Sequence, residues 1–173
     1  MSQKPSERPA VRQPLYTEAE RARRDASPWT VVQGVLAPLQ FLVFLVSLGL
    51  VLRFLSAGEG FALASISVVV KTLVLYTIMI TGSIWEREVF GKWLFARPFF
   101  WEDVFSMLVL ALHTAYLGAA FYRWLEPKGL MILALAAYAT YVINAAQFIV
   151  KLRAARREAP AVVTPRESLA VGS

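Results

Sequence analysis

The chain has 173 residues, 57% of them hydrophobic, and a formal net charge of +6. That length fits one compact domain, and the apolar composition favours a membrane protein over a soluble globular one. The chain contains no cysteine, which excludes disulfides, thiol nucleophiles and thiolate metal sites. No nucleic-acid-binding motif accompanies the positive charge, so membrane lipid rather than nucleic acid is the expected partner.

The N-terminal part of the chain is polar and basic. Three prolines lie among polar residues in 1–14, which predicts disorder there. Thr17 and Glu20 have the spacing of a capping box, which predicts a short basic helix through about Asp25. We expect residues 1–28 to form a cytoplasmic tail with one short helix on the membrane surface.

Four long apolar stretches follow, at residues 31–52, 61–84, 104–122 and 129–150. About 20 apolar residues in a helix span a bilayer, so each stretch is a candidate transmembrane helix. The connections between the stretches are short, which makes sequence neighbours antiparallel neighbours in space. The predicted fold is therefore all-α, an antiparallel bundle of four transmembrane helices over residues 29–152, followed by a cytoplasmic C-terminal tail over 153–173.

The distribution of lysine and arginine predicts the orientation. Six lie in residues 1–30, three in the loop 85–103 and five from Lys151 onward, whereas the two loops on the opposite side hold only three. Positively charged loops are retained in the cytoplasm. Both termini and the loop 85–103 are therefore predicted to be cytoplasmic.

Few acidic or basic side chains lie within the apolar stretches. Lys71 in the second and His113 in the third are the only acidic or basic ones. Such residues usually face the protein interior and are candidates for functional sites. Gln40 and Asn144 lie on polar arcs of the first and fourth stretches, where they either form interhelical hydrogen bonds or contact a substrate.

The predicted loop 85–103 is the most aromatic part of the chain, with Trp85, Trp93, Phe99, Phe100 and Trp101. It is too apolar for water and is expected to form an interfacial aromatic segment between the second and third helices. An ordinary aromatic belt without catalytic purpose would look the same.

Four carboxylates are interleaved with these aromatic residues: Glu86, Glu88, Glu102 and Asp103. A desolvated carboxyl group close to a like charge retains its proton and can act as an acid near neutral pH. The alternative is an interfacial charge cluster in which Arg87 and Lys92 neutralise the carboxylates. About ten residues at 1.5 Å each separate Asp103 from His113, so these two cannot form a direct pair.

The residue types alone indicate no reaction. The chain has no glycine-rich phosphate loop, and a single histidine cannot form a bis-histidine haem site. What they do predict is a four-span membrane protein with an acidic, aromatic-lined mouth on its cytoplasmic side.

Longer strings carry more information: WTVVQGVLAPLQF at 29–41, IWE and VFG within 84–91, FFWEDVFSM at 99–107, LHTAY at 112–116 and AYATYVINA at 137–145. They closely resemble the 3-vinyl bacteriochlorophyllide hydratase family of phototrophic bacteria, and the resemblance covers roughly residues 16–157. It implies a hydro-lyase that adds water to the C3-vinyl group of chlorophyllide a or 3-vinyl bacteriochlorophyllide a. The product would be the 1-hydroxyethyl pigment of bacteriochlorophyll a synthesis.

The resemblance also implies a cellular context. It implies no redox cofactor and no metal held by the protein itself. The chlorophyllide-type pigment is the expected substrate, and other enzymes of bacteriochlorophyll synthesis are candidate partners. The expected location is the bacterial cytoplasmic or intracytoplasmic membrane.

Hydration of a vinyl group needs one acid, one positioned water and stabilisation of a delocalised cation. The resemblance and the residue chemistry together suggest Glu102 or Asp103, supported by Glu86, as the acid and water-activating pair. His113 is the alternative proton donor, or an axial ligand to the pigment's magnesium. The aromatic segment would carry the ring, and Arg87, Lys92 or Arg97 would bind its propionate.

Two rival interpretations stay open at this point. A pigment-binding or assembly protein would use the aromatic segment and His113 but would not need the carboxylates. A small transporter would need a continuous polar path through Gln40, Lys71, His113 and Asn144.

Overall fold

The computed structural model describes residues 15–158, with side chains through Ala154. This part of the chain contains only helices: α1 (Glu18–Ala26), α2 (Pro28–Ala57), α3 (Phe61–Phe90), the short 3₁₀ helix η1 (Arg97–Phe99), α4 (Phe100–Phe121) and α5 (Pro127–Glu158). Four helices are long and apolar enough to cross a membrane, which confirms the predicted all-α class with four spans. The disorder predicted for 1–14 lies outside the described residues, as does the tail predicted over 153–173 except for 153–158, which continue α5.

The helix ends follow local sequence signals. The Thr17 hydroxyl accepts a hydrogen bond from the Glu20 backbone, and the Glu20 carboxylate accepts one from the Thr17 backbone, which confirms the predicted capping box. Ser27 caps α2, whose first residue is Pro28. Gly91 ends α3 with a φ of 74°, the left-handed conformation that glycine adopts without strain.

The predicted loop 85–103 is longer than the loop in the structure. α3 continues through Phe90 and α4 already begins at Phe100, so Glu86 and Glu88 lie on a helix. Glutamate and arginine are good helix formers, so the helix extends beyond the apolar stretch until Gly91 ends it. The connection that remains runs from Gly91 to Ala96 and is followed by η1.

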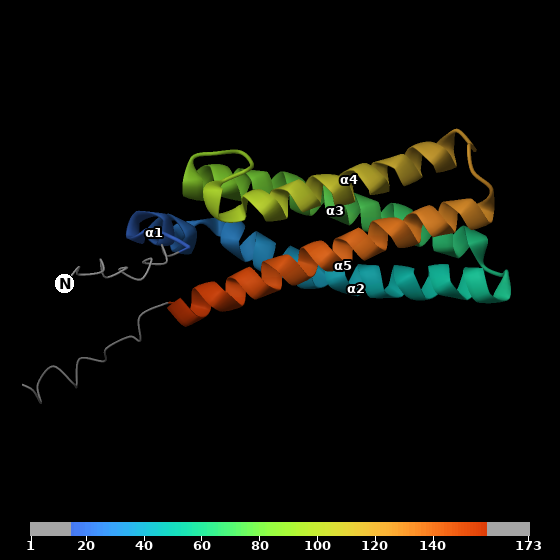
Figure 1. Ribbon diagram of the computed structural model, residues 1–173, viewed down its shortest axis with the longest axis horizontal. Coiled ribbons are helices and arrows are strands. Elements are labelled where there is room, and N and C mark those ends of the chain that lie inside the picture. The colour runs from blue at the N-terminus through green and yellow to red at the C-terminus, as the bar shows by residue number, and fades with distance from the viewer. Residues whose placement is uncertain (1–14, 159–173) are drawn as a thin grey trace, which may run out of the picture.

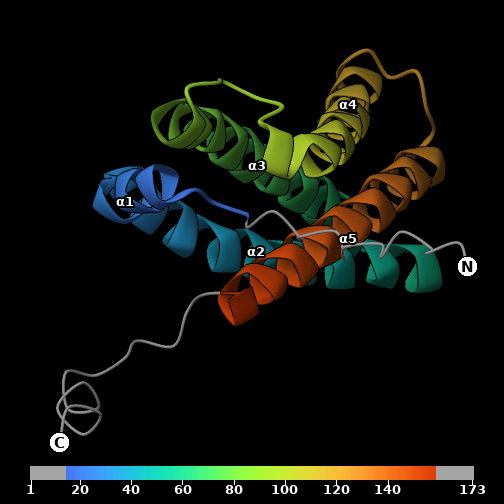
Figure 2. The same ribbon diagram turned by 60° about the vertical axis from the view of Figure 1, so that its left-hand side comes forward.

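Consecutive long helices run in opposite directions (Figure 1). α2 packs along α3 and α4 packs along α5, so the bundle consists of two hairpins. Contacts between the hairpins are sparser, and α2 crosses α5 where the rings of Phe44 and Tyr141 lie 5.0 Å apart. α4 starts beside the end of α3 and then diverges from it (Figure 2). Bundle proteins commonly build ligand sites from side chains on such facing helices.

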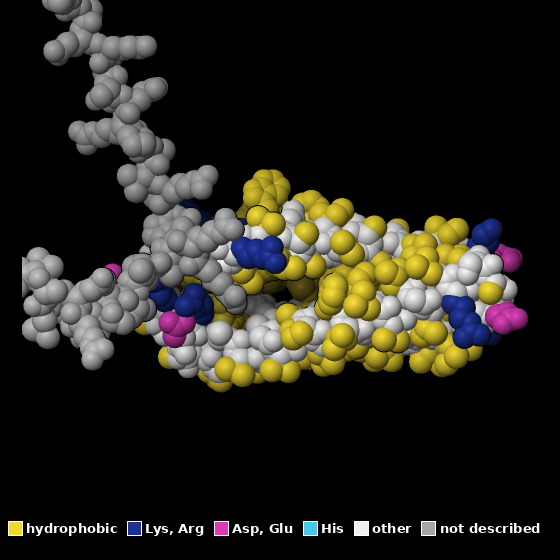
Figure 3. All heavy atoms as spheres, turned by 90° about the horizontal axis from the view of Figure 1, so that it is seen from below, with side chains coloured by type: hydrophobic (Ala, Val, Ile, Leu, Met, Phe, Trp, Pro, Cys, Tyr) yellow, Lys and Arg dark blue, Asp and Glu magenta, His cyan; other side chains and the backbone are white. Residues whose placement is uncertain are grey.

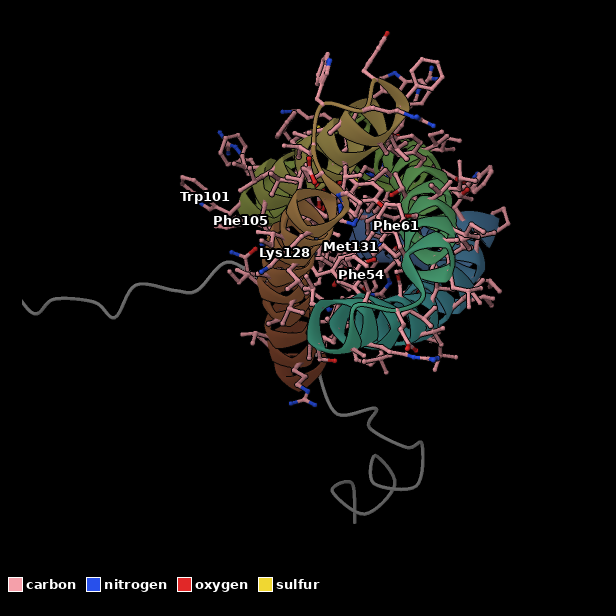
Figure 4. The ribbon with its side chains drawn as sticks, turned by 90° about the vertical axis from the view of Figure 1, so that its right-hand side faces the viewer. Phe54, Phe61, Trp101, Phe105, Lys128 and Met131 are labelled. Atoms are coloured by element: carbon pink, nitrogen blue, oxygen red, sulfur yellow. The ribbon has the colours of Figure 1, made fainter. Side chains whose placement is uncertain are left out.

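The two ends of the bundle differ. One end carries α1 and the last turns of α5, and we call it the α1 end (Figure 1). At the opposite end Phe54, Phe61 and Met131 lie in the middle of the bundle (Figure 4), where they pack against the apolar core. An amphipathic ligand would therefore approach from the α1 end or from the side.

The outer surface is apolar between the two ends, whereas charged side chains gather at the ends (Figure 3). Leu42, Ile66 and Ile132 are examples of large apolar side chains that are exposed on it. A bundle that faces lipid along its sides and water at its ends has this pattern.

The short helix α1 docks on the end of α3. Tyr16, just before α1, is 5% exposed, and its ring stacks on Phe90 with the ring centres 5.7 Å apart. Arg23 on α1 donates from Nε to the backbone carbonyl of Val89 at 2.8 Å. α1 is therefore part of the folded bundle at its α1 end.

Candidate active site

Two carboxyl groups face each other at the α1 end. Glu86 lies near the end of α3 and Asp103 lies in the first turn of α4, and they are 5% and 4% exposed. They accept hydrogen bonds from adjacent backbone N–H groups, those of Phe95 and Ala96, so the two carboxyl groups lie close together. Two carboxyl groups can share a hydrogen bond only when one of them carries a proton. We call them the acid pair, because such an arrangement offers one acid and one base.

The connection between α3 and α4 holds both groups. The Phe95 backbone N–H donates to Asp103 Oδ2 at 2.8 Å, and the Ala96 N–H donates to Glu86 Oε2 at 3.2 Å. Phe95 has a φ of 59°, a left-handed conformation that residues with a side chain rarely adopt. Successive N–H groups in such a turn form a concavity that binds anions. The left-handed conformation of Phe95 thus directs the backbone N–H groups of Phe95 and Ala96 toward the acid pair.

Glu102 has a different partner. Its position directly before Asp103 turns it about 100° around α4, and it forms an ion pair with Lys151 of α5. Lys151 Nζ also donates to the Pro98 carbonyl and lies 5.2 Å from the centre of the Phe99 ring. Lys151 therefore fixes α5 to η1 and to the start of α4, directly beside the acid pair.

The other charged candidates lie at the surface of the α1 end. Ser27 donates to Glu88 at 2.8 Å, and Arg87 lies 4.3 Å from the centre of the Trp93 ring. Lys92 and Arg97 are exposed. Three basic groups at one end can bind a carboxylate of an amphipathic molecule that enters there.

The predicted aromatic residues do not form one continuous surface. Trp85 and Phe99 pack edge to face in the interior, with ring centres 5.8 Å apart. Trp93, Phe100 and Trp101 are exposed, and Trp101 projects from the outside of the bundle (Figure 4). Trp85 and Phe99 therefore belong to a small core cluster with Tyr16 and Val89, whereas Phe100 and Trp101 are suited to lipid.

Polar side chains continue inward from the acid pair. Asn144 on α5 donates from Nδ2 to the Ser106 hydroxyl at 2.8 Å, one helical turn beyond Asp103. Asn144 Oδ1 is buried and has no hydrogen-bond partner within residues 15–158. Gln40 on α2 is also buried. A buried acceptor without a partner marks a place for a ligand group or a water molecule.

Lys71 and His113 lie still deeper, and both are fully buried. His113 Nδ1 bonds to the Val109 carbonyl at 2.8 Å, and since a carbonyl only accepts, Nδ1 carries a proton, which makes Nε2 the acceptor of the neutral ring. In the described part of the chain, neither His113 Nε2 nor Lys71 Nζ has a hydrogen-bond partner. The His113 ring and Lys71 Nζ each lie 5.8 Å from the centre of the Tyr138 ring.

The surface is hollowed between α2 and α5 toward the α1 end (Figure 3). The hollow lies where the two helices separate beyond their crossing at Phe44 and Tyr141. Its position gives a ligand access to the space between the hairpins. The described residues contain no group of histidine and acidic side chains that could hold a metal ion.

Comparisons with known proteins agree on one family. Residues 16–154 match the model of a family described as 2-vinyl bacteriochlorophyllide hydratase. The chain belongs to this hydratase family. A protein of that name from Cereibacter sphaeroides is 66% identical over 143 residues, which cover 82% of the chain and 88% of the relative. A protein of the same name from Rhodobacter capsulatus is 66% identical over 149 residues, which cover 86% of each chain.

No solved structure matches the chain. The family membership confirms the resemblance that the sequence strings indicated. The family name numbers the vinyl position 2, whereas the resemblance above numbers it 3. The matched segment contains the acid pair, Glu102, Lys151 and both deeply buried residues.

Within this hydratase family member, the candidate acidic residues that the sequence grouped together have different surroundings in the structure. Glu102 and Asp103 were alternatives for one role, and the structure gives them different partners. From the sequence, Lys151 was expected at the end of the polar arc that includes Asn144, seven residues earlier on the same helical stripe, but it was given no partner. Nothing in the sequence pattern indicated the two backbone donors at Phe95 and Ala96.

Proposed function

We propose that this chain adds water to the C3-vinyl group of chlorophyllide a or 3-vinyl bacteriochlorophyllide a and forms the 1-hydroxyethyl pigment. The family name supports the reaction. The observation that carries the mechanism is the buried acid pair, Glu86 and Asp103, held by two backbone donors at the α1 end of the bundle. Such a pair holds a transferable proton away from bulk water.

In the proposed reaction, one carboxyl group of the acid pair gives its proton to the terminal vinyl carbon. The inner vinyl carbon becomes a cation that is conjugated with the ring. A water molecule forms a C–O bond to that carbon, and the extra proton of the water returns to the carboxylates. The acid pair ends with the one proton that it had at the start, and the addition is redox-neutral.

Each further group in the proposal has a stated task. The carboxylates and the ring faces of Trp85 and Phe99 stabilise the cation. Glu102 acts through Lys151 as a positioning residue, because this ion pair fixes the start of α4 and with it Asp103. Gln40 and Asn144 are candidate contacts to polar edges of the ring or to the attacking water.

The ring itself is proposed to lie between the hairpins. His113 follows Asp103 by ten residues, about 15 Å along α4, so with the vinyl group at the acid pair His113 lies near the far edge of the ring rather than at its central magnesium. Arg87, Lys92 or Arg97 is the candidate partner of the propionate. Exposed Trp93, Phe100 and Trp101 would cover the approach of the pigment along the membrane interface.

The proposed location is the bacterial cytoplasmic or intracytoplasmic membrane with the α1 end in the cytoplasm. The excess of lysine and arginine at the α1 end over the opposite loops supports this orientation. Pigment and membrane lipid are the proposed partners. Other enzymes of bacteriochlorophyll synthesis are candidates for delivering the pigment or receiving it.

The test is incubation of the detergent-solubilised protein with 3-vinyl chlorophyllide a in water labelled with oxygen-18, followed by mass spectrometry of the pigment. The proposal expects a product heavier than the substrate by one molecule of labelled water. A pigment that binds to the folded protein and stays unchanged would contradict the proposal and favour a pigment-binding protein without catalysis.

A further inference from the structure

Lys71 is the deepest charged side chain of the bundle, and the proposed reaction gives it no task. It lies about midway along α3, is fully buried, and has no hydrogen-bond partner within residues 15–158. Neither ion pair of the described chain involves it. A lysine in such a place is costly in a membrane and points to a functional site with an absent partner.

The surroundings of Lys71 show which partner is absent. Lys71 Nζ lies 4.0 Å from the centre of the Tyr141 ring and 5.8 Å from that of Tyr138. Ring faces attract a cation but do not accept its N–H groups as an oxygen does. The His113 ring lies 5.8 Å from the centre of the same Tyr138 ring, and its Nε2 likewise has no hydrogen-bond partner within residues 15–158. The group that would complete this site is an oxygen acceptor on an otherwise apolar molecule.

The position of Lys71 relative to the acid pair suggests what that molecule is. Lys71 Nζ and the His113 ring are neighbours of the same side chain, since each lies 5.8 Å from the centre of the Tyr138 ring. His113 follows Asp103 on α4 by ten residues, or about 15 Å along the axis. A chlorin ring has a similar length when measured from its C3-vinyl group to the keto oxygen on the opposite edge, with a hydrogen bond at each end.

We propose that Lys71 donates a hydrogen bond to the keto oxygen of the bound pigment, at the ring edge opposite the vinyl group. This inference rests on the proposed function, because it places the vinyl group at the acid pair. In the ligand-free protein the ring of Tyr141 holds the ammonium group instead. Tyr141 also contacts Phe44 at the crossing of α2 and α5. Lys71 is thus a specificity residue, because it favours pigments with a keto oxygen at the ring edge opposite the vinyl group.

The first test is vibrational spectroscopy of the keto C=O stretching band in the bound pigment. A hydrogen bond to the oxygen lowers the frequency of this band. We expect the lower frequency in the wild type and loss of the shift in Lys71→Met, while the exposed Lys128→Met serves as the matched control and keeps it. Met has a similar length and leaves no buried amine without a partner, so Lys71→Met is expected to fold.

The second test is a binding cycle with an analogue whose keto group is replaced by CH₂. The wild type should bind the parent pigment about 10- to 100-fold more tightly than the analogue, the range expected for a hydrogen bond to a charged group. Lys71→Met should bind the two pigments equally. A pigment whose propionate is a methyl ester serves as the control ligand. The loss of affinity from wild type to Lys71→Met should be the same for this ester as for the free acid.

The proposal is wrong if the keto band of the wild-type complex lies where it lies for free pigment in an apolar solvent. That result needs no variant, so a folding defect of Lys71→Met cannot obscure it. An affinity loss that depends on Lys71 and on the free propionate, but not on the keto group, would also contradict it. Neither measurement requires turnover. A normal keto shift in Asp103→Asn that still hydrates the pigment would overturn the acid pair and leave the Lys71 contact intact.

Discussion

Replacing Lys151 by methionine removes the positive partner of Glu102 and leaves its carboxylate buried. The Glu102 side chain is 8% exposed and the Lys151 side chain is 24% exposed. Breaking a fully buried ion pair costs about 3–5 kcal/mol, and breaking an exposed pair costs about 1 kcal/mol or less. This pair lies between those cases, so Lys151→Met is expected to destabilise the protein by about 2 kcal/mol.

The expected loss can be measured as thermal unfolding in detergent, followed by circular dichroism. For a chain of this size, 1 kcal/mol corresponds to about 2–4 °C in Tm, so Lys151→Met should lower Tm by about 4–8 °C. Arg153→Met on the same helix is the matched control, because Arg153 is exposed. It should change Tm by about 2 °C or less.

A double-mutant cycle isolates the ion pair. Glu102→Gln has no buried carboxylate that could lose its partner. Adding Lys151→Met to that variant should therefore lower the unfolding free energy by at least about 1 kcal/mol less than it does in the wild type. If Lys151→Met lowers Tm by the same amount with and without the Glu102 charge, the two groups do not interact and the positioning role of Glu102 is refuted.

Three further changes test other parts of the structure. Phe95→Gly should change stability by less than about 1 kcal/mol, because relief of the left-handed strain offsets the lost packing on Phe100, whereas Phe95→Val keeps the strain and should cost about 1–2 kcal/mol in thermal unfolding. Equal Tm values for these two variants would speak against the strained turn. Tyr138→Phe removes the hydrogen bond to Ser47 between α5 and α2 and should lower the unfolding free energy by about 0.6 kcal/mol without loss of hydration activity. Tyr16→Ala should release α1 and speed tryptic cleavage after Arg23 and Arg24 by tenfold or more at an unchanged Tm of the bundle, since truncating a buried aromatic side chain costs about 3–5 kcal/mol. Unchanged cleavage would mean that α1 is held by other contacts.

The spans and the α1 cap could be predicted because their causes are local in sequence. Apolar stretches of sufficient length indicate membrane helices whatever their neighbours are. Thr17 and Glu20 bond to each other within one helical turn. The end of α3 was missed because hydropathy reports lipid contact rather than backbone hydrogen bonding, and only the conformation of Gly91 ends that helix.

The site could be predicted as a set of residue types but not as a set of partners. The partner of Glu102 is 49 positions away on α5, and no local pattern encodes that distance. Adjacent residues of a helix point in different directions, so Glu102 and Asp103 meet different neighbours although the sequence presents them as one dipeptide. The left-handed backbone conformation of Phe95 could not be predicted either, because an aromatic residue is not a turn signal.

Neighbouring carboxylates with different partners provide the most direct test of the acid pair. Asp103→Asn, Glu86→Gln and Glu102→Gln would be compared for pigment binding and for the rate of C3-vinyl hydration. Removing a general acid costs about 10²–10⁴-fold in rate, so Asp103→Asn and Glu86→Gln should bind pigment and lose hydration by at least about 100-fold. The hydration rate of Glu102→Gln should stay within about tenfold of the wild-type rate. This is the limit expected for a residue that only positions Asp103 and loses its ion pair. Undiminished hydration by Asp103→Asn, or an equal loss in folded Glu102→Gln, would contradict the account.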